Sequence, residues 1–278
     1  MQLSNEQKTE LRQRGVLKLP GLVPECCYAP VRDAVRTRMA KQGLWDGARW
    51  QLDSTPCLAW PRSGPFKKVL RKMKVAGHLV TPELRGIVVD LFGPDASGLF
   101  KTYTDQPQIL FSLPHGREWF LPYTGWHLDV PGIAGVDEPG YQMFTFLEPV
   151  VAGQAGTLVA AGSHRFVTPR VGILRSKNVK RILKRHEVFR RLMSSDGADR
   201  MQLMADETEV DGVPVQVREL TGKPGDVWLM DMRSLHTIAP NAADKPRVMV
   251  TERFVQPEAY ERMMAVYRKR AEPGLLRT

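Results

Sequence analysis

The spacing of apolar residues at the start of the chain predicts two helices and a strand. Ser4 and Gln7 stand three positions apart, as the residues of a capping box do, so a short helix is expected from there to Gly15. Residues 16–20 alternate between apolar and polar side chains, which is typical of a strand. A second helix is expected around residues 31–42, where a glycine follows as a stop.

A stronger helix signal comes at residues 81–93. Thr81 is a favoured N-cap residue, and Pro82 suits the first helical turn because its missing N–H would have no intrahelical partner there. An apolar stripe at helical spacing follows, formed by Leu84, Ile87, Val88 and Leu91. We therefore expect residues 1–100 to form a mainly helical flank.

After about residue 100 the apolar period changes to two, which is the period of β-strands. Eight short runs predict strands, at residues 108–113, 125–130, 141–148, 157–161, 213–218, 227–231, 235–238 and 247–254. Eight such runs predict a β-sandwich or barrel. Its core is expected at residues 101–164 and 213–256, and a predicted helix over 179–193 marks residues 165–212 as a helical insertion or lid.

The predicted helix over residues 179–193 has two chemically different faces. Val179, Ile182, Leu183, Phe189 and Met193 fall on roughly one side, and Lys180, Arg181, Lys184, Arg185, Arg190 and Arg191 fall on the other. Three interpretations of the basic side remain open. It is a solvated face, a lid that presents cations to a phosphate, a carboxylate or a CoA-like tail, or a nucleic-acid contact.

The charge and the cysteine content of the chain indicate what kind of partner and which cellular compartment to expect. Forty Lys and Arg against 30 Asp and Glu give a net charge of +10, which attracts anionic partners at low salt. Three cysteines, two of them adjacent, argue against a disulfide framework and for a reducing cytoplasm. The first residues lack the apolar stretch of a secretory signal, and no window approaches the roughly 18 apolar residues of a membrane span. We expect one cytoplasmic domain over residues 1–278, with no signal for an oligomeric state.

Candidate metal ligands stand on two of the predicted strands. His127 and Asp129 are two residues apart, so on a strand both side chains leave the same face and can reach one metal ion. His236, on a distant strand, could complete a facial set of two imidazoles and one carboxylate. That set leaves three positions open, which suits Fe(II) binding a cosubstrate and O2 together. Zinc sites are usually closed or leave one position open.

A candidate anion-binding residue follows the second histidine. Arg247 stands eleven positions after His236, across a predicted turn, so on antiparallel strands its guanidinium would point into the same pocket. A guanidinium can hold a carboxylate through two parallel hydrogen bonds. Each piece alone is weak, but the four in this order predict a metal site with a carboxylate anchor.

These residues resemble the phytanoyl-CoA dioxygenase family. The likeness covers most of the chain and includes the segments 15–21, 91–93, 156–158 leading into Gly162-Ser163-His164, and Gly225-Asp226, together with the candidate ligands. The resemblance implies a mainly β fold with flanking helices, whose core is a double-stranded β-helix, also called a jelly-roll or cupin-like fold. It also implies Fe(II) as metal, with 2-oxoglutarate and O2 as cosubstrates.

The same resemblance assigns roles to individual residues. It implies that His127, Asp129 and His236 are the metal ligands, and that Arg247 grips the distal carboxylate of 2-oxoglutarate. Further cosubstrate contacts are implied for Ser112 or Gln108, and for Gln142. The chain departs from the family pattern after the second histidine, where it has Thr237 and Ile238. The Gly-Ser-His element is a turn in the family, so His164 is expected to be structural.

The implied reaction is the hydroxylation or desaturation of an unactivated C–H bond in a small, anionic or natural-product-like substrate, with release of succinate and CO2. Asp129 fills the coordination place that a halide takes in related halogenases, which disfavours chlorination. Two alternatives remain. Arg247, Thr251 and Arg253 have the spacing of dioxygenases that demethylate nucleic-acid bases, although Met249 stands where those enzymes often have Asn. The other alternative is a non-catalytic basic binding protein on the same barrel.

Overall fold

The computed structural model describes most of the chain. The described residues are 1–52, 66, 70, 73–93, 101–102, 107–115, 118–130, 132–168, 172–174, 176–196 and 200–271. Cys57 lies outside these residues, and Cys26 and Cys27 are free thiols. No helix in the described part of the chain is long and apolar enough to cross a membrane.

A large antiparallel sheet forms one wall of the fold. Its strand order is β1 (Val16–Leu19), β10 (Val227–Asp231), β5 (Gly140–Phe146), β12 (Arg247–Val255) and β2 (Lys101–Thr102), and β3 (Gln108–Ser112) also pairs with β12. Every residue of β5 is buried, because the strand lies in the middle of the sheet and is covered on both faces. These central strands nevertheless carry buried polar residues, among them Gln142 and Thr145 of β5 and Thr251 of β12.

A smaller antiparallel sheet forms the facing wall. Its order is β11 (His236–Ile238), β6 (Thr157–Ala161), β9 (Val213–Glu219) and β8 (Thr208–Val210). A separate two-stranded sheet joins β4 (Gly132–Ile133) to β7 (Ile173–Leu174). Seven of the eight predicted strands are present with small shifts of their ends, and the exception is the run at 125–130.

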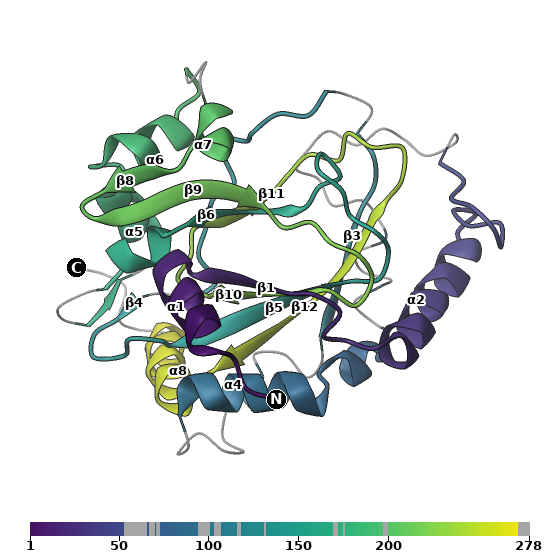
Figure 1. The fold of residues 1–278 in the computed structure, drawn as a ribbon, viewed down its shortest axis with the longest axis horizontal. Coiled ribbons are helices and arrows are strands. Elements are labelled where there is room, and N and C mark those ends of the chain that lie inside the picture. The colour runs from purple at the N-terminus through teal and green to yellow at the C-terminus, as the bar shows by residue number, and fades with distance from the viewer. Residues whose placement is uncertain are drawn as a thin grey trace.

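The flanking helices cover the outer side of the large sheet. Figure 1 shows α4 (Pro82–Phe92) along one side of the molecule near β5 and β12, with α1 (Asn5–Arg14) and α2 (Glu25–Ala40) at other places around that sheet. The helix α1 has the predicted capping box, and Gly15 ends it in the left-handed conformation. A short 3-10 helix, η1 (Ala76–Leu79), precedes α4. The apolar stripe of α4 is buried as predicted.

The predicted start of α2 was wrong. The helix begins at Glu25 rather than near Val31, because Pro30 lies in its second turn and still fits there. A proline in the helix interior normally removes a hydrogen bond and disfavours the helix, so the sequence pattern pointed to a later start. The described residues up to Gly93 are otherwise mainly helical, as expected, with β1 as an edge strand of the large sheet.

The insertion differs from its prediction in one respect. The helix expected over 179–193 is two helices, α5 (Ser176–Leu183) and α6 (Glu187–Leu192), separated by a turn. They are preceded by η3 (Ser163–Phe166) and followed by α7 (Gln202–Ala205), and Figure 1 shows α5, α6 and α7 grouped beside β8 and β9. Val179, Leu183 and Phe189 are fully buried, whereas Arg181, Lys184, Arg185 and Arg190 are exposed. A solvated basic face agrees with this exposure.

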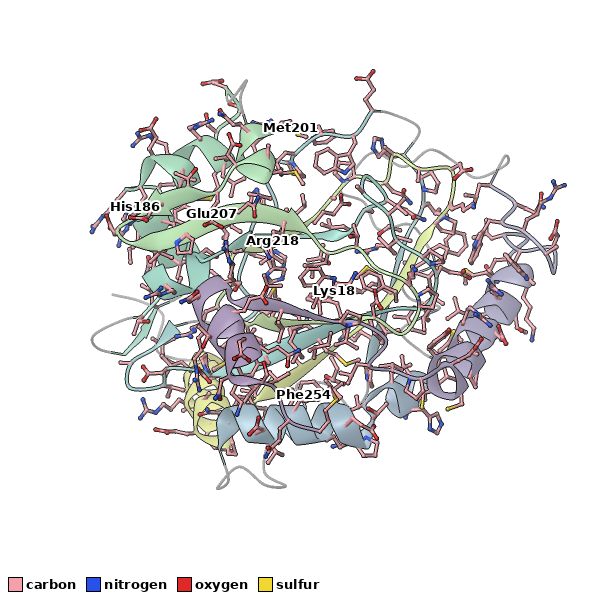
Figure 2. The ribbon with its side chains drawn as sticks, in the orientation of Figure 1. Lys18, His186, Met201, Glu207, Arg218 and Phe254 are labelled. Carbon is pink, nitrogen blue, oxygen red and sulfur yellow. The ribbon has the colours of Figure 1, made fainter. Side chains whose placement is uncertain are left out.

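The interior contains separate apolar clusters on either side of the large sheet. Phe254 of β12 is fully buried among residues of α4, and Figure 2 places it beside that helix. Between the two sheets lies an inner cluster that includes Phe144, Phe146 and Met249, from β5 and β12. The helix α8 (Pro257–Ala271) was not predicted, and its Ala259 and Met263 pack with Val130, which follows the candidate ligand Asp129 closely.

Candidate metal centre

The two candidate histidines lie opposite each other on antiparallel backbone. The N–H of His127 donates to the carbonyl of His236 at 2.9 Å, and the N–H of His236 donates back at 3.0 Å. His127 belongs to an isolated bridge, so the strand predicted over 125–130 is wrong. Gly125 has a φ of 80°, a left-handed conformation that interrupts extended pairing at the start of this segment. One bridge nevertheless suffices to hold His127 beside His236.

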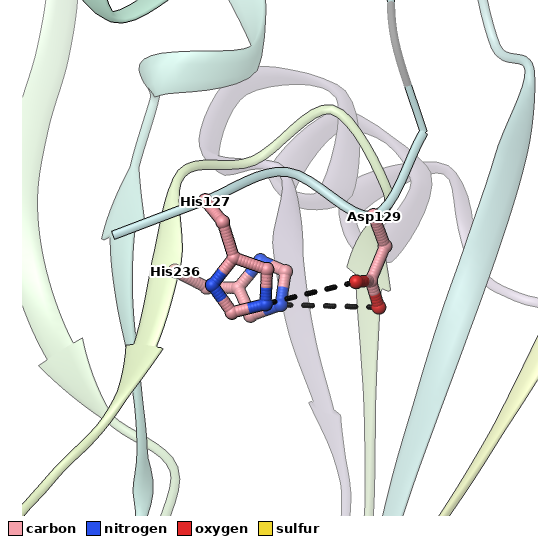
Figure 3. A group of neighbouring side chains, drawn as sticks. All are labelled: His127, Asp129 and His236. Atoms are coloured by element: carbon pink, nitrogen blue, oxygen red, sulfur yellow. Dashed lines mark ion pairs between the residues drawn. The ribbon is translucent and has the colours of Figure 1, made fainter. Parts of the chain in front are cut away.

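The three candidate ligands converge on one point. One ligand atom from each of His127, Asp129 and His236 lies within 4.8 Å of the others. The Nε2 atoms of His127 and His236 are 3.7 Å and 3.9 Å from the two carboxylate oxygens of Asp129, as Figure 3 shows. These separations are longer than a hydrogen bond, and donors about 2 Å from a shared metal are spaced by roughly 3 Å or more. The geometry fits three ligands around one ion.

Hydrogen bonds to backbone carbonyls orient both imidazoles for metal binding. The Nδ1 of His127 lies 2.8 Å from the carbonyl oxygen of Gly125, and the Nδ1 of His236 lies 3.0 Å from that of Ser234. A carbonyl oxygen only accepts, so in each neutral ring Nδ1 carries the proton and Nε2 keeps its lone pair. Both lone pairs are then available on the side that faces Asp129.

Burial and charge set the protonation states that a metal needs. Burial lowers the pKa of His236 to about 4, so this imidazole is neutral near pH 7. Burial alone would raise the pKa of Asp129, but His236 and Arg253 outweigh it and hold that pKa below its usual range. A neutral imidazole and an ionised carboxylate are the forms that coordinate a cation. His127 differs in access, because half of its side chain is exposed to solvent.

The prediction from the sequence missed one residue at this centre. The Nε of Arg253 donates to Oδ2 of Asp129 at 2.6 Å, and the guanidinium is largely buried. Arg253 and Arg247 are six residues apart on β12, so their side chains leave the same face of the strand. The sequence pattern marks Arg253 only by its spacing from Arg247 and Thr251, and does not predict its contact with Asp129.

Arg247 lies at the other end of that strand face, buried in the protein. Its Nη2 donates to Oγ of Ser112 at 2.9 Å, and the two residues are paired between β12 and β3. Burial lowers the pKa of Arg247 to about 10, which still leaves the guanidinium charged near pH 7. Among the described residues its buried Nε has no hydrogen-bond partner. A buried cation with an unused donor fits the binding of an anion.

The two candidate glutamines lie near the metal end of the strand face. Gln142 pairs with Arg253 in the sheet register, and its Nε2 donates to Oγ1 of Thr251 at 2.9 Å. Its Oε1 is buried and has no hydrogen-bond partner in the described part of the chain. Gln108 is paired with Thr251 from the opposite side, on β3. The structure therefore brings Gln142 and Gln108 to the same stretch of β12, and Ser112 to Arg247.

The insertion and the segment that carries the ligands contribute to one apolar cluster. Trp126, next to His127, is 1 % exposed and shares an apolar cluster with Phe189 and Leu183 of the insertion helices. Its Nε1 donates to the carbonyl of Pro122 at 2.8 Å. Further out, the guanidinium of Arg200 stacks over the ring of Tyr123, 5.3 Å from its centroid. Trp126 is thus a core residue that belongs to the same cluster as the insertion helices.

Comparisons with known proteins identify the fold. No protein-family model matches the chain, and no curated protein matches it significantly. The solved structure of SnoK, a non-heme alpha-ketoglutarate-dependent carbocyclase from nogalamycin biosynthesis, matches with a TM-score of 0.53 and 17% identity, over 91% of this chain and 84% of that one. EctD from S. alaskensis, with 2-oxoglutarate and 5-hydroxyectoine, matches with a TM-score of 0.55 and 18% identity, over 91% and 76%.

A third match is the epimerase SnoN in complex with Fe3+, alpha-ketoglutarate and a nogalamycin compound. Its TM-score is 0.52 at 14% identity, over 90% of this chain and 82% of that one. At such identities the likeness identifies the fold alone. The expected fold class is therefore confirmed as mainly antiparallel β with flanking helices, a jelly-roll of the kind that these non-heme iron and 2-oxoglutarate enzymes have.

Proposed function

We propose that the chain is an Fe(II)- and 2-oxoglutarate-dependent oxygenase of the phytanoyl-CoA dioxygenase-like type, which hydroxylates or desaturates a small molecule. The observation that carries the proposal is the convergence of His127, Asp129 and His236, with their ligand atoms within 4.8 Å. A purely structural cluster would join these groups by direct hydrogen bonds. Here both imidazole Nε2 atoms face the carboxylate from beyond hydrogen-bond distance.

The metal would be held by Nε2 of both histidines and a carboxylate oxygen of Asp129. A ferrous ion in such a site supplies the oxidative chemistry, with O2 and 2-oxoglutarate as co-reactants. The protein's part is to fix the ligands: two backbone carbonyls hold the imidazole tautomers, and Arg253 holds one oxygen of the carboxylate. We expect the substrate to approach from the side of His127, because half of that side chain is exposed.

The 2-oxoglutarate would extend from the metal towards Arg247. Arg247 and Ser112 would bind its distal carboxylate, because the buried guanidinium has an unused Nε donor and Ser112 already orients one Nη. Gln142 and Gln108 are proposed as contacts nearer the metal, next to Thr251. Between these polar ends the inner face of the sheet is apolar, with Met249 and Phe146, and suits the methylene groups of the cosubstrate.

A small organic substrate is favoured by what the similar proteins act on. SnoK and SnoN are named for nogalamycin chemistry and EctD was solved with 5-hydroxyectoine, and each is matched over about nine tenths of this chain. A substrate with an anionic group agrees with the net charge of +10. The insertion would form one side of its binding site, because it packs on the segment next to His127.

A second candidate is demethylation of alkylated nucleic-acid bases. It is favoured by the spacing of Arg247, Thr251 and Arg253 on one strand face, and by the contact of Arg253 with Asp129. Met249 argues against it, because this buried residue packs in the apolar lining of the barrel where a polar residue would be expected. Release of succinate that depends on a methylated oligonucleotide would favour this candidate over the first.

The proposed function is tested by following succinate formation from 2-oxoglutarate with Fe(II) and O2, alone and with small-molecule candidates. The wild-type protein should form succinate, and His127→Ala and Asp129→Ala should reduce the rate at least about a hundredfold. His78→Ala is the matched control, because His78 is exposed on η1 and outside the centre. Full turnover in both ligand variants would contradict the proposal, and binding of no metal would favour a non-catalytic barrel.

A further inference from the structure

The carboxylate of Glu219, at the end of β9, is enclosed by a backbone loop. The N–H of Gly153 donates to Oε2 and the N–H of Gly156 donates to Oε1, each at 2.9 Å. Gly153 and Ala155 both have positive φ, of 82° and 56°, in the turn that brings the N–H groups of Gly153 and Gly156 to the same carboxylate. For Ala155 that conformation is unfavourable, so the loop holds a strained residue where it wraps the carboxylate.

There is no room at Gly156 for any larger residue. A Cβ there would lie 2.6 Å from Cγ of Glu219, which is closer than real contacts allow. The side chain of Glu219 and the loop backbone are therefore fitted to each other. Its carboxylate is a fixed charge rather than a mobile surface group.

The same loop is bonded to the segment that leads into Arg247. Gln154 forms an antiparallel bridge with Asn241, and its Nε2 donates to the carbonyl of Pro246 at 3.4 Å. Asn241 Nδ2 in turn donates to the carbonyl of Ser112 at 3.1 Å and to that of Lys245 at 2.8 Å. Glu219, the loop, Ser112 and the residues before Arg247 thus belong to one hydrogen-bonded frame.

Across this hydrogen-bonded frame, the charges of Glu219 and Arg247 act on each other. Burial lowers the pKa of Arg247, and the negative charge of Glu219 opposes that shift. Burial raises the pKa of Glu219, while the two backbone donors and Arg247 act against it. The two side chains do not form an ion pair within 4.0 Å, so Glu219 compensates the charge of Arg247 without occupying its donors. The N–H donors of Arg247 therefore remain available to Ser112 and to an incoming ligand.

We infer that Glu219 is the resident counter-ion of Arg247, a positioning residue that keeps the buried guanidinium charged and fixed, and that competes with an anion arriving at Arg247. The second half of this inference rests on the proposed function, with the distal carboxylate of 2-oxoglutarate as the arriving anion. Because Glu219 repels that carboxylate, it weakens the binding of 2-oxoglutarate and of succinate. The exchange of product for cosubstrate is faster as a result.

A ligand-free double-mutant cycle tests the charge pair itself. The urea midpoints of wild type, Glu219→Gln, Arg247→Met and the double variant are compared, which isolates the interaction of the two side chains. Glu219→Gln should lower the midpoint clearly in the wild-type background and much less in the Arg247→Met background. Equal effects in both backgrounds would overturn the inference. This measurement needs no metal or cosubstrate, so it stands if the proposed function fails.

Binding of 2-oxoglutarate to the Mn(II)-loaded protein tests the competition. The Kd of wild type is compared with that of Glu219→Gln, and Gln154→Ala is the control that loosens the frame without changing its charge. Glu219→Gln should bind 2-oxoglutarate and succinate at least about tenfold more tightly than wild type, as expected for loss of one like charge within about 12 Å at an effective dielectric of about 20. Gln154→Ala should bind them equally or more weakly.

The outcomes separate the two proposals. If wild type binds 2-oxoglutarate and Arg247→Met does not, the cosubstrate site is supported and the Glu219 variant decides the inference. Weaker or unchanged binding of 2-oxoglutarate by Glu219→Gln would contradict the proposed competition between Glu219 and the arriving carboxylate. If wild type binds no 2-oxoglutarate with Mn(II) or Fe(II), the proposed function is wrong, and the double-mutant cycle alone decides whether Glu219 is the counter-ion of Arg247.

Discussion

Arg253 donates from Nε to Oδ2 of Asp129 over 2.6 Å, across 124 positions of sequence. The contact joins the end of the longest strand, β12, to the irregular segment that carries His127 and Asp129. That segment has one isolated bridge in place of a strand, so its position depends on such long-range contacts. The carboxylate of Asp129 is therefore oriented from outside its own segment.

Replacing Arg253 by methionine should weaken Fe(II) binding about 10- to 100-fold, the usual effect of removing a partner of a metal ligand. The cause is the loss of the hydrogen bond and charge that fix Asp129. Affinity is measured by anaerobic titration. Arg12→Met is the matched control, because Arg12 pairs with Glu138 at the surface and should leave the affinity unchanged. Equal affinity in Arg253→Met and wild type would show that Asp129 is held by its backbone alone.

The sequence was sufficient to predict which residues would meet, but not all of the local structure that brings them together. His127, Asp129 and His236 converge as expected, although His236 lies in a strand and the other two do not. The segment 125–130 was expected to be a strand because its apolar residues alternate. The left-handed Gly125 breaks that pairing, and alternation alone does not reveal which residue adopts such a conformation.

The insertion shows a second limit of sequence patterns. The apolar residues of 179–193 follow a helical period through 184–186, where the structure has a turn between α5 and α6. Leu183 and Phe189, on either side of this turn, pack in one cluster with Trp126, and such tertiary packing leaves no local signal in the sequence. The same reason applies to Glu219, whose partners Gly153 and Arg247 are distant in sequence.

Replacing Arg247 by methionine should abolish measurable binding of 2-oxoglutarate, whereas Arg247→Lys should bind it at least tenfold more weakly than wild type. Lysine keeps the charge but loses the planar pair of donors. Ser112→Ala should have a smaller effect of a few fold, because it only frees one Nη of Arg247. Calorimetric titration of the Mn(II)-loaded protein measures all three. An unchanged Kd in Arg247→Met would place the cosubstrate anchor elsewhere.

A buried ion pair predicts how stability depends on pH. Asp231 and Arg233 are joined at 2.7 Å and both are almost fully buried. Burial would raise the pKa of Asp231, but Arg233 outweighs it, so the pKa in the folded protein lies below the unfolded value of about 3.9. The ionised carboxylate therefore stabilises the fold above that value, and this stabilisation is lost as pH falls through the folded pKa.

Asp231→Asn should accordingly destabilise the protein most at neutral pH, by about 3–5 kcal/mol, because it leaves the guanidinium of Arg233 buried without its anion. The difference from wild type should narrow as the pH falls below about 4. Urea unfolding at pH 7, 5 and 3.5 measures it. If wild type and Asp231→Asn differed by the same free energy of unfolding at all three pH values, the charge of the Asp231–Arg233 pair would not contribute to the pH dependence of stability.

The contact between the insertion and the metal segment predicts a linked effect on stability and metal affinity. Phe189 is fully buried against the cluster that contains Trp126, so Phe189→Ala should cost about 3–5 kcal/mol. It should also weaken Fe(II) binding, because Trp126 is next to His127. Ile182→Ala, on a partly exposed side chain of the same insertion, should have little effect on either. If Phe189→Ala lost stability but kept its affinity for Fe(II), the insertion would not help to position the metal ligands.

The central claim is that His127, Asp129 and His236 bind one ferrous ion. Anaerobic titration of the protein with Fe(II) tests it most directly, with unfolding midpoints measured in parallel to confirm that each variant is folded. Wild type and His78→Ala should bind one Fe(II) per chain, and His127→Ala and His236→Ala should lose at least about a hundredfold in affinity. Stoichiometric binding with wild-type affinity in folded His127→Ala and His236→Ala would contradict the account.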